Sequence, residues 1–188
     1  GTMANGTTSP VPQTSPLDIS SVAGPIGTVA LGLAHSCVTT TSNQLQCWGG
    51  NGSGQVGDGT TVARTAPVAV TGLATASSAS GAYSHSCAVT TTGGAKCWGA
   101  GQFGQLGVGG PGWPSAGVAY TATDVFGLTS GVSEVATGGN RSCARTVAGA
   151  LKCWGDNAAG GLGDGTTTPA NAPVDVQGLS SGVTSVVV

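Results

Sequence analysis

Charged residues are scarce in this chain of 188 residues: five Lys and Arg and seven Asp and Glu make up 6% of the sequence, and the formal net charge is −2. A phosphate backbone is bound by a basic stripe, which is absent, so we expect no nucleic-acid partner. Long apolar runs are absent too. The longest aliphatic runs, such as Val186–Val188, have three residues, whereas about 18 are needed to span a membrane. We therefore expect no membrane insertion.

Residues that build amphipathic helices are also few, because Leu, Ile, Phe, Glu, Lys and Arg are all infrequent. Glycine accounts for 35 residues, and Thr, Ser and Val are abundant. This composition favours short strands joined by tight turns, and hence an all-β protein. Residues 1–27 stand apart as a tag remnant, "GTM", followed by a linker rich in Thr, Ser and Pro.

One stretch of the sequence occurs three times. It is HSCVTTTSNQLQCWG at residue 35, HSCAVTTTGGAKCWG at residue 85 and RSCARTVAGALKCWG at residue 141. The two cysteines are always ten positions apart, and a tryptophan always follows the second. The chain therefore divides into three repeats, 28–78, 79–131 and 132–182, and residues 183–188 duplicate the first strand of a repeat.

A repeat of about 50 residues with several β-rich segments is typical of a propeller blade. In the first repeat we predict four strands, near Val29–Leu31, Ser36–Thr40, Leu45–Trp48 and Pro67–Val70. Because side chains alternate between the two faces of a strand, each tryptophan points away from the neighbouring cysteine. We expect these tryptophans to pack between blades, at Trp48, Trp98 and Trp154.

The cysteines of each repeat lie opposite each other in the predicted hairpin, within disulfide range. The predicted disulfides are Cys37–Cys47, Cys87–Cys97 and Cys143–Cys153. Zinc is the alternative use of six cysteines, although zinc ligands usually come in closer pairs such as C-x-x-C, which do not occur here. Disulfides predict an oxidising location, namely extracellular, cell-surface or periplasmic.

These repeats resemble those of the regulator of chromosome condensation family. The residues that carry the resemblance are HSCAVTTTGGAKCWGAGQFGQLG and CWGDNAAGGLGDGTTTPANAPVDVQGL, and they are most similar to the cysteine-paired versions in secreted bacterial proteins. The resemblance implies a β-propeller, usually of seven four-stranded blades, that serves as a protein-binding platform. Family members include a nucleotide-exchange factor for a nuclear GTPase and a secreted inhibitor of β-lactamases, and none of their partner-specific residues maps onto this chain.

Three repeats are fewer than the four to eight blades of a propeller. Two explanations remain open: the sequence is part of a longer propeller, or further copies of the chain complete the ring and exchange a terminal strand. An open stack of blades exposes unpaired edges and apolar faces. We therefore expect the isolated chain to associate with itself.

The repeated polar residues favour structural roles. His35 and His85 precede the first cysteine by two positions, but Arg141 stands there in the third repeat, which a shared metal or catalytic site would not tolerate. A hydrogen bond at the start of a strand is the simpler interpretation. Asp58 and Asp164 belong to "GDGT" segments, which are typical of turns, with calcium binding as the alternative.

Catalysis has little support, because the carboxylates are scattered and no nucleophile is accompanied by a base. We expect no catalytic residue, metal or cofactor. The second repeat carries an insertion, VGGPGWPSAGVAYTAT, whose Trp113 and Tyr120 are candidate contact residues. Insertions in repeats often lie on the binding face. Phe103 is a further candidate, and the alternative for Trp113 is that it folds back over a blade end.

The sequence thus predicts a non-enzymatic extracellular module for binding, adhesion or structure. Its partners are another copy of itself, the rest of a longer propeller, or a protein or glycan ligand. One alternative is a secreted inhibitor similar to the propeller-type β-lactamase inhibitor, which would need a broad aromatic face, although the chain has only eight aromatic residues. The other alternative is a carbohydrate-binding propeller.

Overall fold

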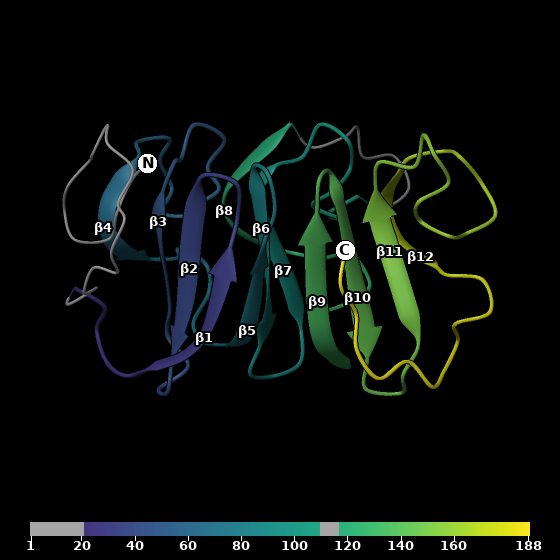
Figure 1. Ribbon diagram of the computed structural model, residues 1–188, viewed down its shortest axis with the longest axis horizontal. Coiled ribbons are helices and arrows are strands. Elements are labelled where there is room, and N and C mark those ends of the chain that lie inside the picture. The colour runs from purple at the N-terminus through teal and green to yellow at the C-terminus, as the bar shows by residue number, and fades with distance from the viewer. Residues whose placement is uncertain (1–20, 110–116) are drawn as a thin grey trace, which may run out of the picture.

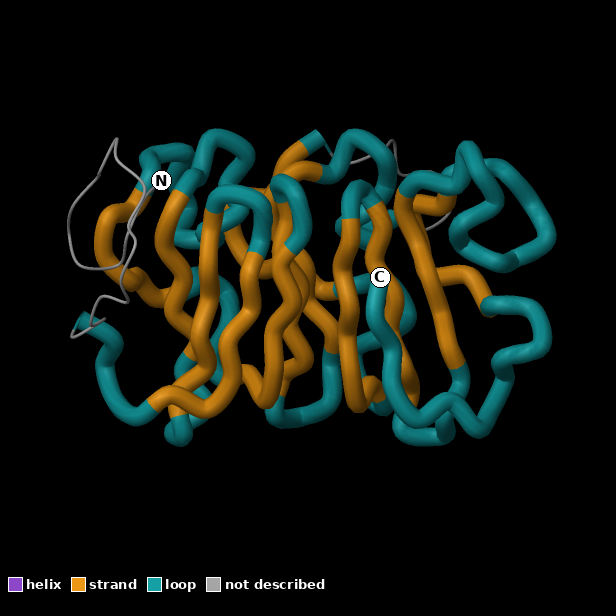
Figure 2. The backbone as a smooth tube through the Cα atoms, in the orientation of Figure 1, coloured by secondary structure: helices purple, strands orange, loops and turns teal. Residues whose placement is uncertain are grey.

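The computed structural model describes residues 21–109 and 117–188, and these residues form three four-stranded antiparallel sheets. The sheets stand side by side in chain order, as Figures 1 and 2 show. Each sheet corresponds to one sequence repeat, and the row of sheets is not closed. The prediction of an all-β, partial propeller is confirmed. Within the described part of the chain, no helix is long and apolar enough to cross a membrane.

We call the three sheets blades 1, 2 and 3. Blade 1 contains β1 (Ile26–Leu31), β2 (His35–Thr40), β3 (Leu45–Gly49) and β4 (Arg64–Ala69). Blade 2 contains β5 (Ala76–Gly81), β6 (His85–Thr90), β7 (Ala95–Ala100) and β8 (Val118–Asp124). Blade 3 contains β9 (Val132–Gly138), β10 (Arg141–Thr146), β11 (Leu151–Gly155) and β12 (Ala170–Asp175). In each blade the strands pair in the order of the chain, and the first strands β1, β5 and β9 contact one another from blade to blade.

The fourth strand of blade 1 begins earlier than predicted. It starts at Arg64, which pairs with Gly49 of β3, rather than near Pro67. An ion pair of 2.5 Å between Arg64 Nε and Asp58 Oδ2 ties this first residue to the preceding loop. In blade 3 the fourth strand starts at the matching residue, Ala170, which pairs with Gly155 and carries no charge. Backbone pairing with the glycine after the tryptophan therefore sets the start of this strand, which hydrophobic patterning does not reveal.

The glycine after each tryptophan lies at or one residue before the end of the third strand, in a left-handed conformation. Gly49 and Gly99 have φ values of 106° and 99°, which L side chains rarely adopt. A Cβ atom at either position would lie 2.5 Å from a backbone carbonyl oxygen of the neighbouring strand connection, at Ala34 and Ser84 respectively. The Cys-Trp-Gly motif therefore needs its glycine for close approach of the backbone.

The cysteines pair as predicted. In blade 1, Cys37 and Cys47 are direct cross-strand partners of β2 and β3 with a Cα–Cα distance of 4.1 Å. The same arrangement recurs in the other two blades, and no described cysteine is free. Each disulfide lies in the apolar core of its blade, so the disulfides supply core volume in blades that have few large aliphatic side chains.

The joint between blades 1 and 2 is built on one carbonyl group. Gln55 O of blade 1 accepts a hydrogen bond of 2.9 Å from Trp98 Nε1 and one of 3.0 Å from Ser86 Oγ, both of blade 2. Since the single Ser86 hydroxyl proton is donated to Gln55, His35 Nε2 of blade 1 must donate its proton to Ser86 Oγ, at 2.7 Å. Trp98 is fully buried in this joint.

The joint between blades 2 and 3 repeats this arrangement. Gln105 O accepts bonds of 2.9 Å from both Trp154 Nε1 and Ser142 Oγ, and His85 Nε2 lies 2.9 Å from Ser142 Oγ. We call this set the blade lock: a carbonyl and a histidine of one blade, and a tryptophan and a serine of the next. It satisfies polar groups that would otherwise be buried without a partner.

One atom of each lock is left without a partner. His35 and His85 are 3% and 0% exposed, and their Nδ1 atoms have no hydrogen-bond partner among the described residues. A proton on Nδ1 would be buried and unpaired. Burial accordingly lowers the pKa of both histidines from 6.5 to about 4, and the charge on His35 lowers the pKa of His85 as well.

We expect removal of one disulfide to destabilise the protein strongly. In the chain-entropy model, a bridge between cysteines ten positions apart contributes roughly 3 kcal/mol. The double variant Cys87→Ser, Cys97→Ser should therefore lower the free energy of unfolding by about this amount in urea titrations. Reduction of the wild-type protein should have a larger effect, because it opens all three bridges. An unchanged urea midpoint on reduction would contradict this structural role.

We expect the blades to come apart in mild acid. With a folded pKa of about 4 and an unfolded pKa near 6.5, the unfolded chain binds more protons between these values. Stability is therefore complete above pH 6.5 and falls as the pH drops toward 4, by roughly 3 kcal/mol for each histidine.

Thermal unfolding as a function of pH measures this loss. In the variant His85→Gln, which keeps an amide donor, the slope between pH 6.5 and 4 should fall by about half, because only His35 remains to titrate. The lowered pKa of Asp58 acts below this window and serves as an internal reference. A slope unaffected by the substitution would show that His85 does not cause the acid sensitivity.

Candidate functional site

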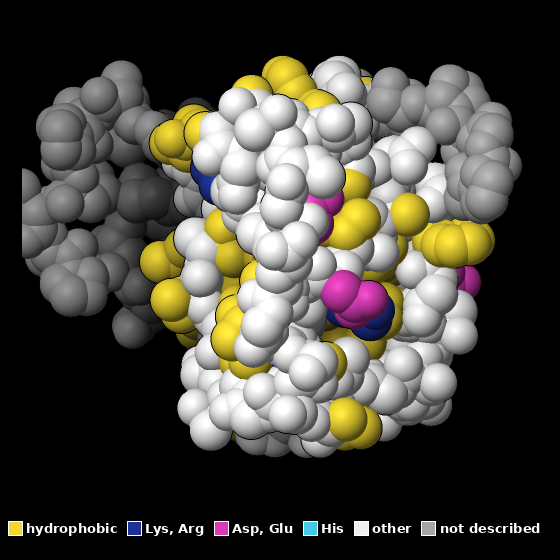
Figure 3. All heavy atoms as spheres, turned by 90° about the vertical axis from the view of Figure 1, so that its right-hand side faces the viewer, with side chains coloured by type: hydrophobic (Ala, Val, Ile, Leu, Met, Phe, Trp, Pro, Cys, Tyr) yellow, Lys and Arg dark blue, Asp and Glu magenta, His cyan; other side chains and the backbone are white. Residues whose placement is uncertain are grey.

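Blade 3 presents the same face that blades 1 and 2 use to form a blade lock, but no further blade covers it. A groove of about 580 Å³ lies on this face. Figure 3 looks at the molecule from the blade 3 side and shows hydrophobic side chains at its surface. We call this feature the open groove and define it by Arg141, Gly161, Leu162, Gly163 and Val176.

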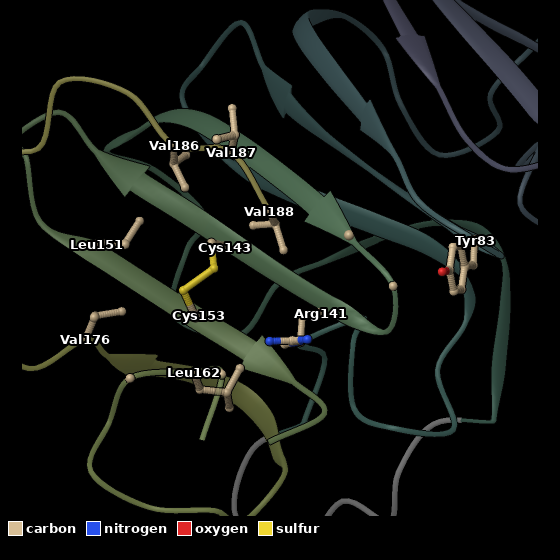
Figure 4. A pocket seen from close by; sticks show the side chains of 14 residues that line it. Tyr83, Arg141, Cys143, Leu151, Cys153, Leu162, Val176, Val186, Val187 and Val188 are labelled. Carbon is tan, nitrogen blue, oxygen red and sulfur yellow. A yellow bond between two sulfur atoms is a disulfide. The ribbon is translucent and has the colours of Figure 1, made fainter. Parts of the chain in front are cut away.

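The apolar floor of the open groove is built around the blade 3 disulfide. Leu162, 1% exposed, packs against Cys143 and Cys153, and Val176 lies beside this cluster. Figure 4 shows Val186–Val188 on one side of the disulfide and Leu162 and Val176 on the other. A partner that fills the groove therefore has to bring an apolar group.

Residues 183–188, which we call the tail, occupy one side of the open groove. Val183 N donates to Gly149 O at 3.0 Å. The equivalent bonds at the earlier joints, from Ala76 N and Val132 N at the starts of β5 and β9, are each 2.8 Å long. Val186 packs into the blade 3 cluster. The tail thus lies on blade 3 where β5 lies on blade 1 and β9 lies on blade 2.

Two substitutions distinguish the open groove from the other two faces. Arg141 stands where the blade locks have histidine, and Gly161 stands where they have Gln55 and Gln105. A Cβ atom added to Gly161 would collide with Arg141 Nη1, so the guanidinium fills the space that a glutamine side chain would need.

Arg141 also differs from the other basic residues in its electrostatic surroundings. The other four each have a carboxylate partner, in the pairs Arg64–Asp58, Lys96–Asp124, Arg145–Glu134 and Lys152–Asp175. Arg141 has no such partner within residues 21–109 and 117–188. The open groove therefore combines an apolar floor with one unneutralised positive charge at its edge.

The aromatic residues predicted to bind a partner lie at two different joints. Phe103 is 48% exposed and lines a shallow pocket of about 310 Å³ with Pro169 and Asn171 of blade 3. Tyr120 is 46% exposed and lies next to Gly54 of blade 1. Tyr120 does not line the pocket at Phe103, so the two aromatic residues belong to separate surface features. Trp113 lies outside the described residues, and its role stays a prediction.

The "GDGT" segments form turns that are held together by an asparagine. The Asn51 side-chain amide donates to Asp58 Oδ1 at 3.2 Å, Thr60 O at 3.0 Å and Val62 O at 3.1 Å. Asn157 makes the same three contacts in blade 3. Burial raises the pKa of Asp58, but hydrogen bonds from Thr60 and Arg64 outweigh this effect and the pKa is lowered overall.

The pKa of Asp164 in blade 3 is lowered as well. The Thr166 backbone N–H donates to its carboxylate and lowers the pKa of Asp164 by more than burial raises it. Both carboxylates thus accept hydrogen bonds from their own turn. Among the described residues, no group of three or more His, Cys, Asp or Glu side chains is arranged to hold a metal ion.

Sequence reasoning did not identify the open groove. The signal was present in the third repeat, where two positions that agree in the first two repeats change together, at Arg141 and Gly161. Their proximity in space does not follow from the sequence, since they are 20 positions apart and belong to β10 and to a loop.

Comparison with known proteins supports the relation that the repeats suggest. A model of the regulator of chromosome condensation (RCC1) repeat matches residues 28–55, 79–105 and 132–160, and a second model of this repeat matches residues 43–89. No curated protein sequence matches the chain.

Solved structures of larger propellers superpose on the three blades. Prp20p from Saccharomyces cerevisiae, whose binding to Gsp1p and histones has been described, matches with a TM-score of 0.71 and 21% identity over 81% of this chain. Human WBSCR16 matches with a TM-score of 0.72 and 21% identity over 83% of this chain. The matches cover only 38% and 39% of those two proteins. The fold and the repeat matches agree, and the chain belongs to the regulator of chromosome condensation (RCC1) repeat family.

Proposed function

We propose that this chain is a non-enzymatic binding and adhesion module of an extracellular or cell-surface protein, and that its copies associate with one another. The observation that carries this proposal is how the repeated polar side chains are used. His35, Ser86, Asn51 and Asp58 are all engaged in hydrogen bonds within the scaffold. The groups that remain available are exposed faces, which suit binding rather than catalysis.

The extracellular location rests on the disulfides. Three cysteine pairs at bonding distance are compatible with an oxidising compartment. Blades that take part of their core from disulfides depend on such a compartment to stay folded. A cytosolic location would keep the thiols reduced and remove this support.

Binding of a foreign protein rests on the exposed aromatic residues. Phe103 and Tyr120 are about half exposed, and aromatic residues are enriched at interfaces because they bury a large area at low entropic cost. Prp20p, whose solved structure is similar to these three blades, has described binding properties to Gsp1p and histones. We extend to this chain only the use of the fold as a protein-binding platform.

A printed array of purified extracellular proteins and a glycan array together test the foreign ligand. We expect the labelled, oxidised chain to be retained on protein spots and not on glycans. The double variant Phe103→Ala, Tyr120→Ala should weaken this retention by at least about tenfold, as for aromatic residues at interface centres.

The matched control is Val147→Ala, which removes an apolar side chain that is 72% exposed in the β10–β11 turn. Its retention should equal that of the wild type. Retention on glycans alone would replace the proposal with the carbohydrate-binding alternative, and equal retention of all variants would remove Phe103 and Tyr120 from the site.

Self-association is tested by the mass of the chain in solution. We expect light scattering to show a mass above that of one chain, 17.8 kDa, which decreases on dilution. Reductant should abolish the association, because the blade faces need the disulfides to keep their shape. A chain that stays monomeric at all accessible concentrations would contradict self-association and leave the foreign-ligand proposal unaffected.

A further inference from the structure

We propose that the open groove of blade 3 is the receptor for blade 1 of a second copy of this chain, with Trp48 of that copy as the group that enters it. This inference rests on the proposed self-association and assigns it a surface. It commits to a head-to-tail contact, in which blade 3 of one copy and blade 1 of the other form a third joint, with Arg141 where the two blade locks have a histidine.

The equivalent faces of blades 1 and 2 are each covered by the tryptophan of the next blade, Trp98 and Trp154. A Cβ atom added to Gly57 would lie 2.7 Å from Trp98 Nε1, and one added to Gly107 would lie 2.7 Å from Trp154 Nε1. Each glycine thus makes room for the indole of the next blade. Gly163 is the third member of this set and has the same left-handed backbone, with a φ of 68°. Its nearest described neighbour is Val176, so no described indole uses the space.

Burial confirms that a cover is missing from blade 3. Val70 and Val125, which line the two closed locks, are 5% and 0% exposed. Val176 occupies the equivalent position and is only half-buried. Leu128 is 4% exposed in blade 2, whereas its counterpart Leu179 in blade 3 is 39% exposed. The side chains that are more exposed in blade 3 than in the other blades are thus ones that a further blade would contact.

The open groove also keeps the hydrogen-bond acceptor of the lock. Gly161 O is the equivalent of Gln55 O and Gln105 O, since all three follow the second cysteine of their repeat by eight positions. No described residue donates to Gly161 O. An incoming indole N–H and serine hydroxyl would find the acceptor that they use at the other two joints.

Blade 1 of a second copy carries the matching donors. The tryptophans and serines of blades 2 and 3 are engaged in the two locks within the chain. Trp48 and Ser36 are their counterparts in blade 1, and neither donates a hydrogen bond to a residue in the described part of the chain. Among the described residues, Trp48 shares an apolar cluster with Val38, and Val22 packs against this cluster. Trp48 is 5% exposed, so docking has to displace Val22 from the indole.

The tail and β1 compete for one position at this contact. The tail already lies where the first strand of the next blade belongs, and a docked blade 1 would bring β1 to the same place. β1 has to give way in the complex. It pairs with β2 at five residue pairs, but its side chains Val29 and Leu31 are 58% and 68% exposed and contribute little burial. In the complex the tail replaces β1 beside β2, with Val186 opposite Val38 and Val188 opposite Ser36, following the register of Val29 and Leu31.

Two complementary variants test the contact. Trp48→Ala removes the incoming indole and leaves the open groove intact, whereas Val176→Glu places a carboxylate in the groove and leaves Trp48 intact. Each variant alone should raise the concentration at half-association by more than about tenfold, as for a tryptophan at an interface centre. An equimolar mixture should regain the mass of a pair, because the groove of one variant can take the Trp48 of the other.

The control for the groove variant is Val147→Glu, the same substitution at an exposed valine outside the groove, which should associate like the wild type. Folding of every variant is checked by thermal unfolding. Variants that associate as well as the wild type would leave self-association standing and overturn the groove as its site. A mixture of folded variants that stays monomeric would also overturn it. A monomeric wild type would overturn this inference together with self-association.

A second measurement does not depend on the stability of the Trp48 variant. A photo-crosslinking amino acid in place of Val187 should attach the tail of one copy to β2 of another, at residues 35–40. Crosslinks confined to the same chain, at β9 or β10, would contradict strand exchange between copies.

Discussion

The hydrogen bonds to Gln55 O and Gln105 O are the interaction on which the rest of this structure depends. Each carbonyl binds the tryptophan and the serine of the next blade, so one acceptor fixes both the distance and the rotation between two sheets. Sheets with few large side chains have little apolar area with which to define that geometry. A buried polar network defines it instead, because any other arrangement leaves its groups unpaired at a cost of about 1–3 kcal/mol each.

Contacts within a single repeat could be predicted from the sequence, whereas contacts between repeats could not. The cross-strand pairing of Cys37 with Cys47 follows from their spacing and from the alternation of side chains along a strand. The partner of Ser86 does not follow, because it lies in the preceding repeat and depends on how two sheets are oriented. The start of β4 at Arg64 escaped prediction although it lies within a repeat, because the backbone pairing of Arg64 with Gly49 sets it, and the apolar pattern of the sequence does not show that pairing.

Two residues of the third repeat that differ from the first two repeats, Arg141 and Gly161, lie next to each other in the structure. In blades 1 and 2 the glutamine side chain also stabilises its own turn, where Gln55 Oε1 accepts from Ser53 N and Gln105 Oε1 accepts from Phe103 N. In blade 3 the turn carries a different bond: the Asp156 carboxylate accepts from Ala158 N, one residue before the position that matches Ser53 and Phe103. Gly161 then leaves room for Arg141, and the turn is kept while the groove gains a positive charge. The two changes are linked in one direction, since a side chain at residue 161 would collide with the guanidinium where it now lies.

A contact between unlike faces has consequences that a symmetric contact does not. When blade 3 of one copy takes blade 1 of another, each new copy brings another open groove, so association continues until the rotation between blades closes a ring. Propellers close with four to eight blades, and two copies of three blades fall within that range. Closure therefore depends on the angle that the blade lock imposes. An angle that suits six blades gives a discrete pair, and one that suits seven leaves an open assembly of growing length.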